Sequence, residues 1–94
     1  MKYREEFHPK VKNDLKKIDK QVVKKIKEIH LNKILDAPCD NPMLKGKLSH
    51  IYSYHFKENK TEYRIAYSIE DGYIVFYYMI AKRENFYEKI KNRI

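Results

Sequence analysis

The stretch YSYHFKENKTEYRIAY, residues 52–67, decides the fold because it holds two runs in which aromatic and polar residues alternate around a polar turn. Alternation with a period of two indicates β-strands, and we expect strands over 51–57 and 63–69. Successive side chains of a strand point to opposite faces of the sheet. If the strands pair in antiparallel fashion with their apolar faces together, His55 and Arg64 share the other face.

The two faces of this expected hairpin differ in chemistry. The apolar face is predicted to be core and consists of Tyr52, Tyr54, Phe56, Tyr63, Ile65, Tyr67 and Ile69. The opposite face carries Ser53, His55, Lys57, Arg64, Ala66 and Ser68. Because Ala66 and Ser68 are small, we expect them to leave a floor open beside the basic side chains. The pattern therefore predicts a concave cationic site on this face.

The flanking segments predict an α+β fold with the element order β-α-α-β-β-β-α. Residues 73–80 are apolar on both faces, which is typical of a covered central strand, and a turn at residues 70–72 joins them to the preceding strand as a hairpin. The other expected elements are a strand over Lys2–His8, helices starting at Pro9 and Asp19, a loop over 38–50 and a helix from Glu84 to about Ile94. A helical hairpin packed on a mainly antiparallel four-stranded sheet follows from this order.

Composition and charge restrict the classes of protein. We expect one domain over residues 1–94, because the chain is too short for two cores. The net charge of +8, from 21 Lys and Arg against 13 Asp and Glu, favours an acidic partner such as nucleic acid, an anionic protein or a lipid surface. The alternative explanation for this charge is a composition that is simply rich in lysine.

The single cysteine and the lack of long apolar runs indicate a cytoplasmic protein. Cys39 cannot form an intrachain disulfide and has no second ligand motif for structural zinc, so we expect no metal and no cofactor. The longest apolar run, Tyr73–Ala81, falls well short of the roughly 20 residues that span a bilayer, and the N-terminus has no apolar signal region.

Individually, the polar residues of the predicted site have ordinary interpretations. Arg64 alone favours a snorkelling side chain or an ion pair with Glu58 or Glu62, and His55 alone favours an ordinary sheet histidine. Together on a face with small residues, they favour acid–base chemistry and phosphate stabilisation. Arg83 follows the central strand, and Tyr87 after it suits either the site or the packing of the last helix.

Three segments, EYRIAY, IAKRENFY and NPMLKGKLSHIYSYHF, resemble the RelE/ParE toxin superfamily, whose element order is the same. The resemblance covers nearly the whole chain. It implies a toxin that pairs with an antitoxin. In the RelE branch it also implies a ribosome-dependent endoribonuclease that cuts messenger RNA in the A site without a metal ion.

By this resemblance, Arg64 and Arg83 bind phosphate, and Tyr87 stacks on a base or assists proton transfer. His55 lies where RelE has a lysine and other ribonuclease branches have arginine or histidine, while Ser53 occupies another RelE lysine position. The implied catalytic residues are His55, Arg64, Arg83 and Tyr87, and the implied substrate-binding residues are Lys57, Ser53, Lys82, Lys45 and Lys47. Some branches add an acid or histidine near Pro42, for which Asp40 or His50 can substitute.

Two other functions fit the same sequence. The ParE branch of the superfamily inhibits DNA gyrase by binding it and does not cut RNA. A basic RNA-binding module without catalysis is the second alternative, with helix lysines that contact phosphates. The lysines in question are Lys10, Lys12, Lys16, Lys17, Lys24, Lys25 and Lys27.

Overall fold

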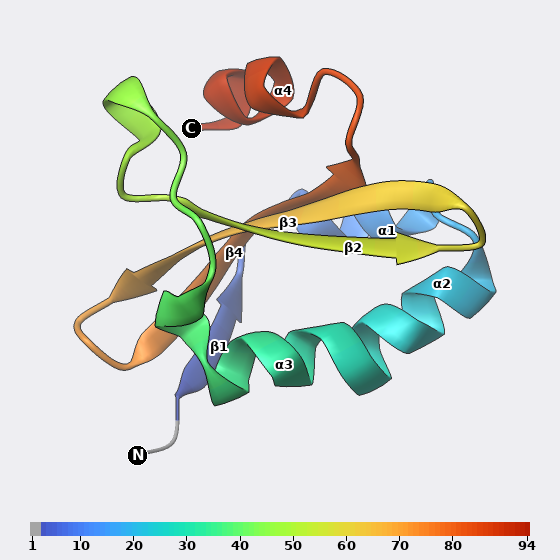
Figure 1. Ribbon diagram of the computed structural model, residues 1–94, viewed down its shortest axis with the longest axis horizontal. Helices are drawn as coiled ribbons and strands as arrows, with labels where there is room; N and C mark the ends of the chain where they lie inside the picture. The colour runs from blue at the N-terminus through green and yellow to red at the C-terminus, as the bar shows by residue number, and fades with distance from the viewer. Residues whose placement is uncertain (1–2) are drawn as a thin grey trace.

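The computed structural model describes residues 3–94 and consists of a four-stranded mixed sheet with helices on both faces (Figure 1). The strands are β1 (Arg4–Phe7), β2 (Tyr52–Glu58), β3 (Thr61–Glu70) and β4 (Ile74–Lys82), in the spatial order β1-β4-β3-β2. β1 pairs with β4 in parallel, and the other pairs are antiparallel. The helices and helical turns are α1 (Val11–Lys16), α2 (Lys20–Lys25), the π-turn η1 (Ile26–His30), α3 (Leu31–Asp36), the 3-10 turns η2 (Pro38–Asp40) and η3 (Gly46–Leu48), and α4 (Phe86–Arg93).

The predicted α+β class and element order are confirmed, with shifts at several boundaries. The first strand covers Arg4–Phe7, and the Lys2 end of its predicted range lies outside the described residues. The second helix begins where Asp19 accepts a hydrogen bond from the Gln21 backbone, as an N-cap does. The last helix begins at Phe86, because Asn85 adopts a left-handed backbone with φ of 56° that cannot belong to the helix.

The larger core lies between the sheet and the helical hairpin formed by α1 and the α2–η1–α3 segment. Figure 1 shows the α2–η1–α3 segment below the sheet, α1 behind it and α4 above it. The predicted apolar face of β2 and β3 points into this core, where Tyr67 and Ile65 are fully buried. Tyr77 of β4 packs beside them, so aromatic rings supply much of the volume that a chain of this length must bury.

A smaller core lies under α4 and corrects the prediction of an open floor. Ala66 is fully buried in it, packed with Met79, Phe86 and Ile90. Ser68 is also buried, and its hydroxyl donates a hydrogen bond to Glu70 at 2.7 Å. The small Ala66 therefore lets α4 approach the sheet, and the open part of this face is shorter than predicted.

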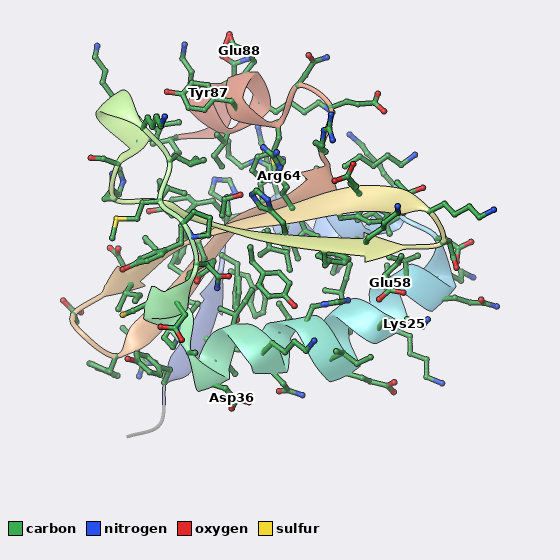
Figure 2. All side chains as sticks on the ribbon, in the orientation of Figure 1. Lys25, Asp36, Glu58, Arg64, Tyr87 and Glu88 are labelled. Atoms are coloured by element: carbon green, nitrogen blue, oxygen red, sulfur yellow. The ribbon has the colours of Figure 1, made fainter. Side chains whose placement is uncertain are left out.

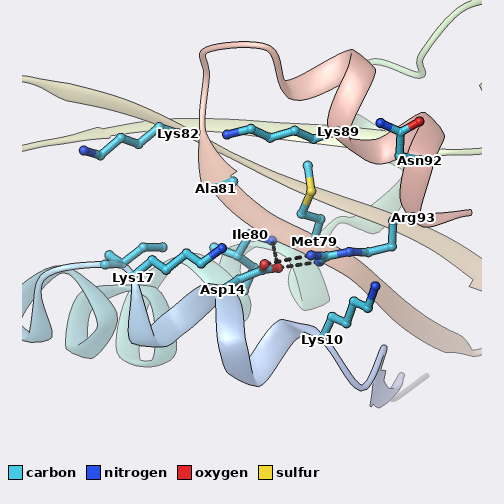
Figure 3. Close-up of a pocket in the computed structure, with 11 residues that line it drawn as sticks. Lys10, Asp14, Lys17, Met79, Ile80, Ala81, Lys82, Lys89, Asn92 and Arg93 are labelled. Carbon is cyan, nitrogen blue, oxygen red and sulfur yellow. Dashed lines mark hydrogen bonds and ion pairs between the residues drawn. The ribbon is translucent and has the colours of Figure 1, made fainter.

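An ion pair closes the outer edge of β4 beyond the end of β1. β1 pairs only with residues 74–77, so the next edge groups of β4 need other partners. Arg93 donates to the Tyr78 carbonyl at 2.9 Å, and Asp14 accepts from the Ile80 N–H at 3.1 Å. The two side chains also bind each other, with N–O distances of 2.6 and 2.9 Å (Figure 3). The end of α4 is thereby attached to both α1 and β4.

No helix within residues 3–94 has both the length and the apolar character needed to cross a membrane.

Candidate functional site

The strand register places His55 directly opposite Arg64 on neighbouring strands β2 and β3. Ser53 lies opposite Ala66, and Lys57 lies opposite Glu62. The prediction that these polar side chains share one face of the sheet is therefore confirmed. Figure 2 shows Arg64 and Tyr87 on the side of the sheet that carries α4.

A shallow pocket of about 270 Å³ lies at this position. Its floor is formed by Ser53, His55 and Arg64 of the sheet, and Tyr87 of α4 forms one wall. The other wall is the segment 42–45, which runs beside β2. Backbone hydrogen bonds hold this segment, because the Ser53 N–H donates to the Pro42 carbonyl and the Leu44 N–H donates to the Ile51 carbonyl, both at 2.8 Å. The pocket thus joins residues that are far apart in the sequence.

The surroundings of His55 in the pocket favour its neutral form. Its Nε2 atom lies 3.0 Å from the Oγ atom of the buried Ser53, which orients the imidazole ring. Partial burial lowers the pKa of His55 below its usual value, the Arg64 guanidinium lowers it further, and Glu62 opposes both effects. His55 is therefore neutral at pH 7 and can accept a proton.

Tyr87 belongs to the pocket and not to the core, so the alternative of core packing is wrong. Its side chain is 39% exposed. Its hydroxyl donates a hydrogen bond to the Lys45 carbonyl at 3.1 Å. The following Gly46 has a positive φ of 68°, and a Cβ there would lie 3.8 Å from the Tyr87 hydroxyl. A left-handed glycine thus turns the loop towards α4.

The two arginines of the candidate site have different surroundings. Arg64 is half-buried and forms no ion pair with any group of residues 3–94, so the alternative of an ion pair with Glu58 or Glu62 is wrong. Arg83 binds Glu62 instead, with 2.8 Å between Nη1 and Oε2. Its own N–H also donates to the Glu62 carbonyl at 3.0 Å. Because Arg64 has no carboxylate partner there, its guanidinium can bind an anion.

Glu62 is the residue of this face that sequence reasoning treated only as a partner for Arg64. The alternation of β3 places Glu62 on the same face as Arg64, and the register places it opposite Lys57. This carboxylate therefore lies among three basic side chains. The contact between Glu62 and Arg83 could not be predicted because the two residues are far apart in the sequence.

The other predicted residues are spread over a wider surface. Lys45 lines the pocket, whereas Lys57, Lys47 and Lys82 are exposed outside it. Lys82 lines a different groove, between α1 and α4. Neither Asp40 nor His50 lines the pocket, so His55 is the only histidine among the lining residues, and none of them is Asp or Glu. Within the described part of the chain, no three His, Cys, Asp or Glu side chains cluster as metal ligands would.

Sequence reasoning missed a second polar cluster, on the hairpin side of the sheet. The buried His30 bonds Tyr54 through Nδ1 and Glu58 through Nε2, each at 2.9 Å. Lys25 reaches the other Glu58 oxygen at 3.2 Å, and the two lie side by side in Figure 2. These contacts lower the pKa of Glu58 and tie η1 to β2, which is a structural role.

Comparison with known protein families identifies the family of this chain. Residues 6–91 match the family described as ParE-like toxins of type II bacterial toxin–antitoxin systems. The match spans most of the 94 residues, and the chain belongs to this family of toxins. The resemblance to the RelE/ParE superfamily is thereby confirmed. No curated protein sequence matches the chain.

Solved structures of RelE toxins share the fold. A mutant of the E. coli toxin RelE in the free state has a TM-score of 0.75 and 20% identity, over 99% of this chain and 94% of that one. The RelBE2 toxin–antitoxin complex from Mycobacterium tuberculosis has a chain with a TM-score of 0.75 and 21% identity, over 88% and 100%. The same E. coli mutant in complex with a peptide of its antitoxin RelB has a TM-score of 0.68 and 20% identity, over 100% and 96%.

Proposed function

We propose that this toxin is a ribosome-dependent endoribonuclease that cleaves messenger RNA in the A site and needs no metal ion. The observation that carries the proposal is the pairing of a neutral His55 with an Arg64 that has no carboxylate partner within residues 3–94. Both lie in one pocket with Tyr87, on a chain with a net charge of +8. A ribosomal target places the proposed activity in the cytoplasm.

The proposed reaction is an internal attack within the RNA chain. His55 accepts the proton of a ribose 2′-hydroxyl, whose oxygen attacks the adjacent phosphorus atom. Arg64 and Arg83 stabilise the extra negative charge on the phosphate. The bond from phosphorus to the 5′ oxygen breaks, and an acid protonates that oxygen. The products are a 2′,3′-cyclic phosphate and a 5′-hydroxyl end.

Tyr87 is the first choice for the acid because its hydroxyl lies at the rim of the pocket, and Lys57 is the second. Ser53 holds the imidazole of His55, and Lys45 supplies a cation for a neighbouring phosphate. Arg83 must exchange its contact with Glu62 for one with the RNA, which an exposed ion pair permits at small cost.

We also propose that the chain pairs with a cognate antitoxin. The E. coli relative was solved with a peptide of the antitoxin RelB, and the M. tuberculosis relative was solved in a toxin–antitoxin complex. The excess of basic residues favours an acidic antitoxin, which is attracted to the toxin at long range.

Inhibition of DNA gyrase is the second candidate function, and the ParE-like description of the family favours it. Such a toxin acts by binding and does not need a neutral histidine beside an arginine. A non-catalytic RNA-binding module is a third candidate. It predicts salt-sensitive RNA binding that survives His55→Ala.

Induced expression of the wild type, His55→Ala and Arg64→Ala tests these candidates, with transcript ends mapped by primer extension. We expect the wild type to generate new ends within translated codons. Proton transfer contributes roughly 10²–10⁴-fold, so His55→Ala should lower cleavage by that factor and keep RNA binding. Arg64→Ala should weaken both. The exposed His50 lies outside the pocket, so His50→Ala is the matched control.

Growth arrest without new ends would contradict the ribonuclease, and gyrase-dependent DNA breaks would support the ParE-like function. A purified system with ribosomes tests the need for metal in the chemical step. Cleavage that requires added Mg²⁺ beyond what intact ribosomes need would contradict the proposed mechanism.

A further inference from the structure

A groove of about 530 Å³ lies between α1, the end of β4 and α4, and it shares no lining residue with the candidate site. Four lysines surround it: Lys10 and Lys17 flank α1, Lys82 ends β4 and Lys89 belongs to α4. Figure 3 shows their side chains around the groove, with the Asp14–Arg93 pair at its base. We call it the lysine-rimmed groove.

The positive charge of this groove is unopposed. Lys10, Lys17, Lys82 and Lys89 are all exposed, and none of them forms an ion pair with another group of the described chain. The one acid of the lining, Asp14, is 8% exposed and already binds Arg93 in a bidentate pair. Charges of one sign around a hollow attract a ligand of the opposite sign.

Beside the Asp14–Arg93 pair, part of the floor of the groove is aliphatic. Ile18 and Met79 are buried there, and Ala81 is half-buried beside them. No aromatic ring belongs to the lining. Single-stranded nucleic acid binds proteins by stacking bases on aromatic rings, and this floor offers none. Aliphatic side chains of a peptide can pack on such a floor while carboxylates reach the lysines at the rim.

We propose that the lysine-rimmed groove is a docking site for a peptide segment that is acidic and aliphatic, supplied by a partner protein. The groove exists only with α4 in place, because Lys89, Asn92 and Arg93 of α4 line it. The segment therefore binds beside α4 and does not replace it. The proposal is independent of RNA cleavage, because the groove uses no residue of the catalytic pocket.

Binding of synthetic peptides to the purified 94-residue chain, followed by fluorescence anisotropy, tests this docking. The probe is a 12-residue peptide of glutamate and leucine, and its controls are the same peptide with glutamine for glutamate and a single-stranded RNA of 12 uridines. The variants are Lys10→Glu/Lys17→Glu/Lys89→Glu and a matched control, Lys20→Glu/Lys24→Glu/Lys33→Glu, which changes the charge equally on α2 and α3.

We expect the acidic peptide to bind the wild type and the glutamine peptide to bind much more weakly. Loss of three exposed ion pairs should weaken peptide binding to the groove variant by about 3- to 150-fold, and the control variant should lose much less. An equal loss in both variants would mean diffuse attraction and would overturn the proposal. RNA that competes for the groove while the peptide does not bind would overturn it too.

Mapping by NMR on the unmodified chain keeps the test valid if the groove variant fails to fold. The peptide should shift the signals of Ile18, Met79 and Ala81 and leave those of His55 unchanged. Phe86 and Ile90 should stay buried, so their signals should not shift. Release of these two residues would mean that the peptide displaces α4, which contradicts docking beside it.

Discussion

Two ion pairs attach arginines near the C-terminus to distant carboxylates, and they differ in almost every physical respect. Arg93 and Asp14 are 14% and 8% exposed and meet through two contacts, of 2.6 and 2.9 Å. The side chains of Arg83 and Glu62 are 59% and 56% exposed and meet through one contact of 2.8 Å. The buried pair also satisfies two backbone groups of β4, so it belongs to the architecture.

The difference separates stability from function within one short region. A buried charge that loses its partner is costly because water cannot replace that partner. An exposed charge that loses its partner is simply hydrated, so the pair contributes little. The buried pair therefore keeps α4 in place, whereas the exposed pair leaves Arg83 able to exchange Glu62 for another anion.

The largest effect is expected from breaking the buried pair. Arg93→Met leaves Asp14 charged and buried and removes the donor to the Tyr78 carbonyl, which should lower the free energy of unfolding by about 3–5 kcal/mol. Arg83→Met is the matched control and should cost less than about 1 kcal/mol. Urea unfolding followed by circular dichroism measures both. Similar losses in the two variants would mean that burial does not distinguish the pairs.

A second, smaller effect on stability is expected from the pKa of His55, which lies on the same face as the exposed pair. The folded pKa of His55 lies below the 6.5 of an ordinary histidine, so between these two values the unfolded chain binds more protons. The contribution of His55 to stability is therefore present above pH 6.5 and is lost as the pH falls through its folded pKa. NMR titration of the imidazole measures this pKa directly.

Variants of its neighbours sharpen the result. Arg64→Gln removes a cation and should raise the pKa of His55, and Glu62→Gln removes an anion and should lower it. In the Arg64→Gln variant the pKa should stay below 6.5, because burial is the larger cause. In the profile of cleavage rate against pH, the acidic limb should move with the measured pKa of His55 in each variant. A limb that stays in place would assign proton transfer to another group.

The fold could be predicted from local patterns because each pattern has a local physical cause. Alternation with a period of two determined the faces of β2 and β3, and the register then brought His55 and Arg64 together. The covering of Ala66 could not be predicted, because the apolar side of α4 does not say on which part of the sheet it packs. That choice depends on contacts across the whole chain.

The polar contacts that complete the molecule are the part that the sequence does not reveal. Asp14 and Arg93 are 79 positions apart, and His30 and Glu58 are 28 apart. Both carboxylates have ordinary surface interpretations until the fold brings their partners near. Glu62 was an alternative ion-pair partner for Arg64, but in the structure it binds Arg83. Arg83 directly follows β4 and lies beside Glu62 on this face of the sheet.

The smallest expected effect on stability comes from the exposed pair itself, and it has a functional consequence. Glu62→Gln should change the free energy of unfolding by less than about 1 kcal/mol, since both side chains are mostly exposed. The variant frees Arg83 and removes a negative charge beside Arg64, so RNA should bind more tightly. The gain should be clear at low salt and fade as salt screens the charges.

Measurement of RNA affinity over a range of salt concentrations, with cleavage at saturating RNA, distinguishes the two roles that Glu62 can have. If Glu62 does nothing more than occupy Arg83, the Glu62→Gln variant should bind RNA more tightly. Its cleavage rate at saturating RNA should then stay constant or increase. Glu70→Gln, at an exposed position at the far end of β3, is the matched control and should change neither. A lower cleavage rate at saturation in Glu62→Gln alone would mean that the carboxylate positions Arg83 for the reaction, and the exposed pair would then belong to the catalytic arrangement.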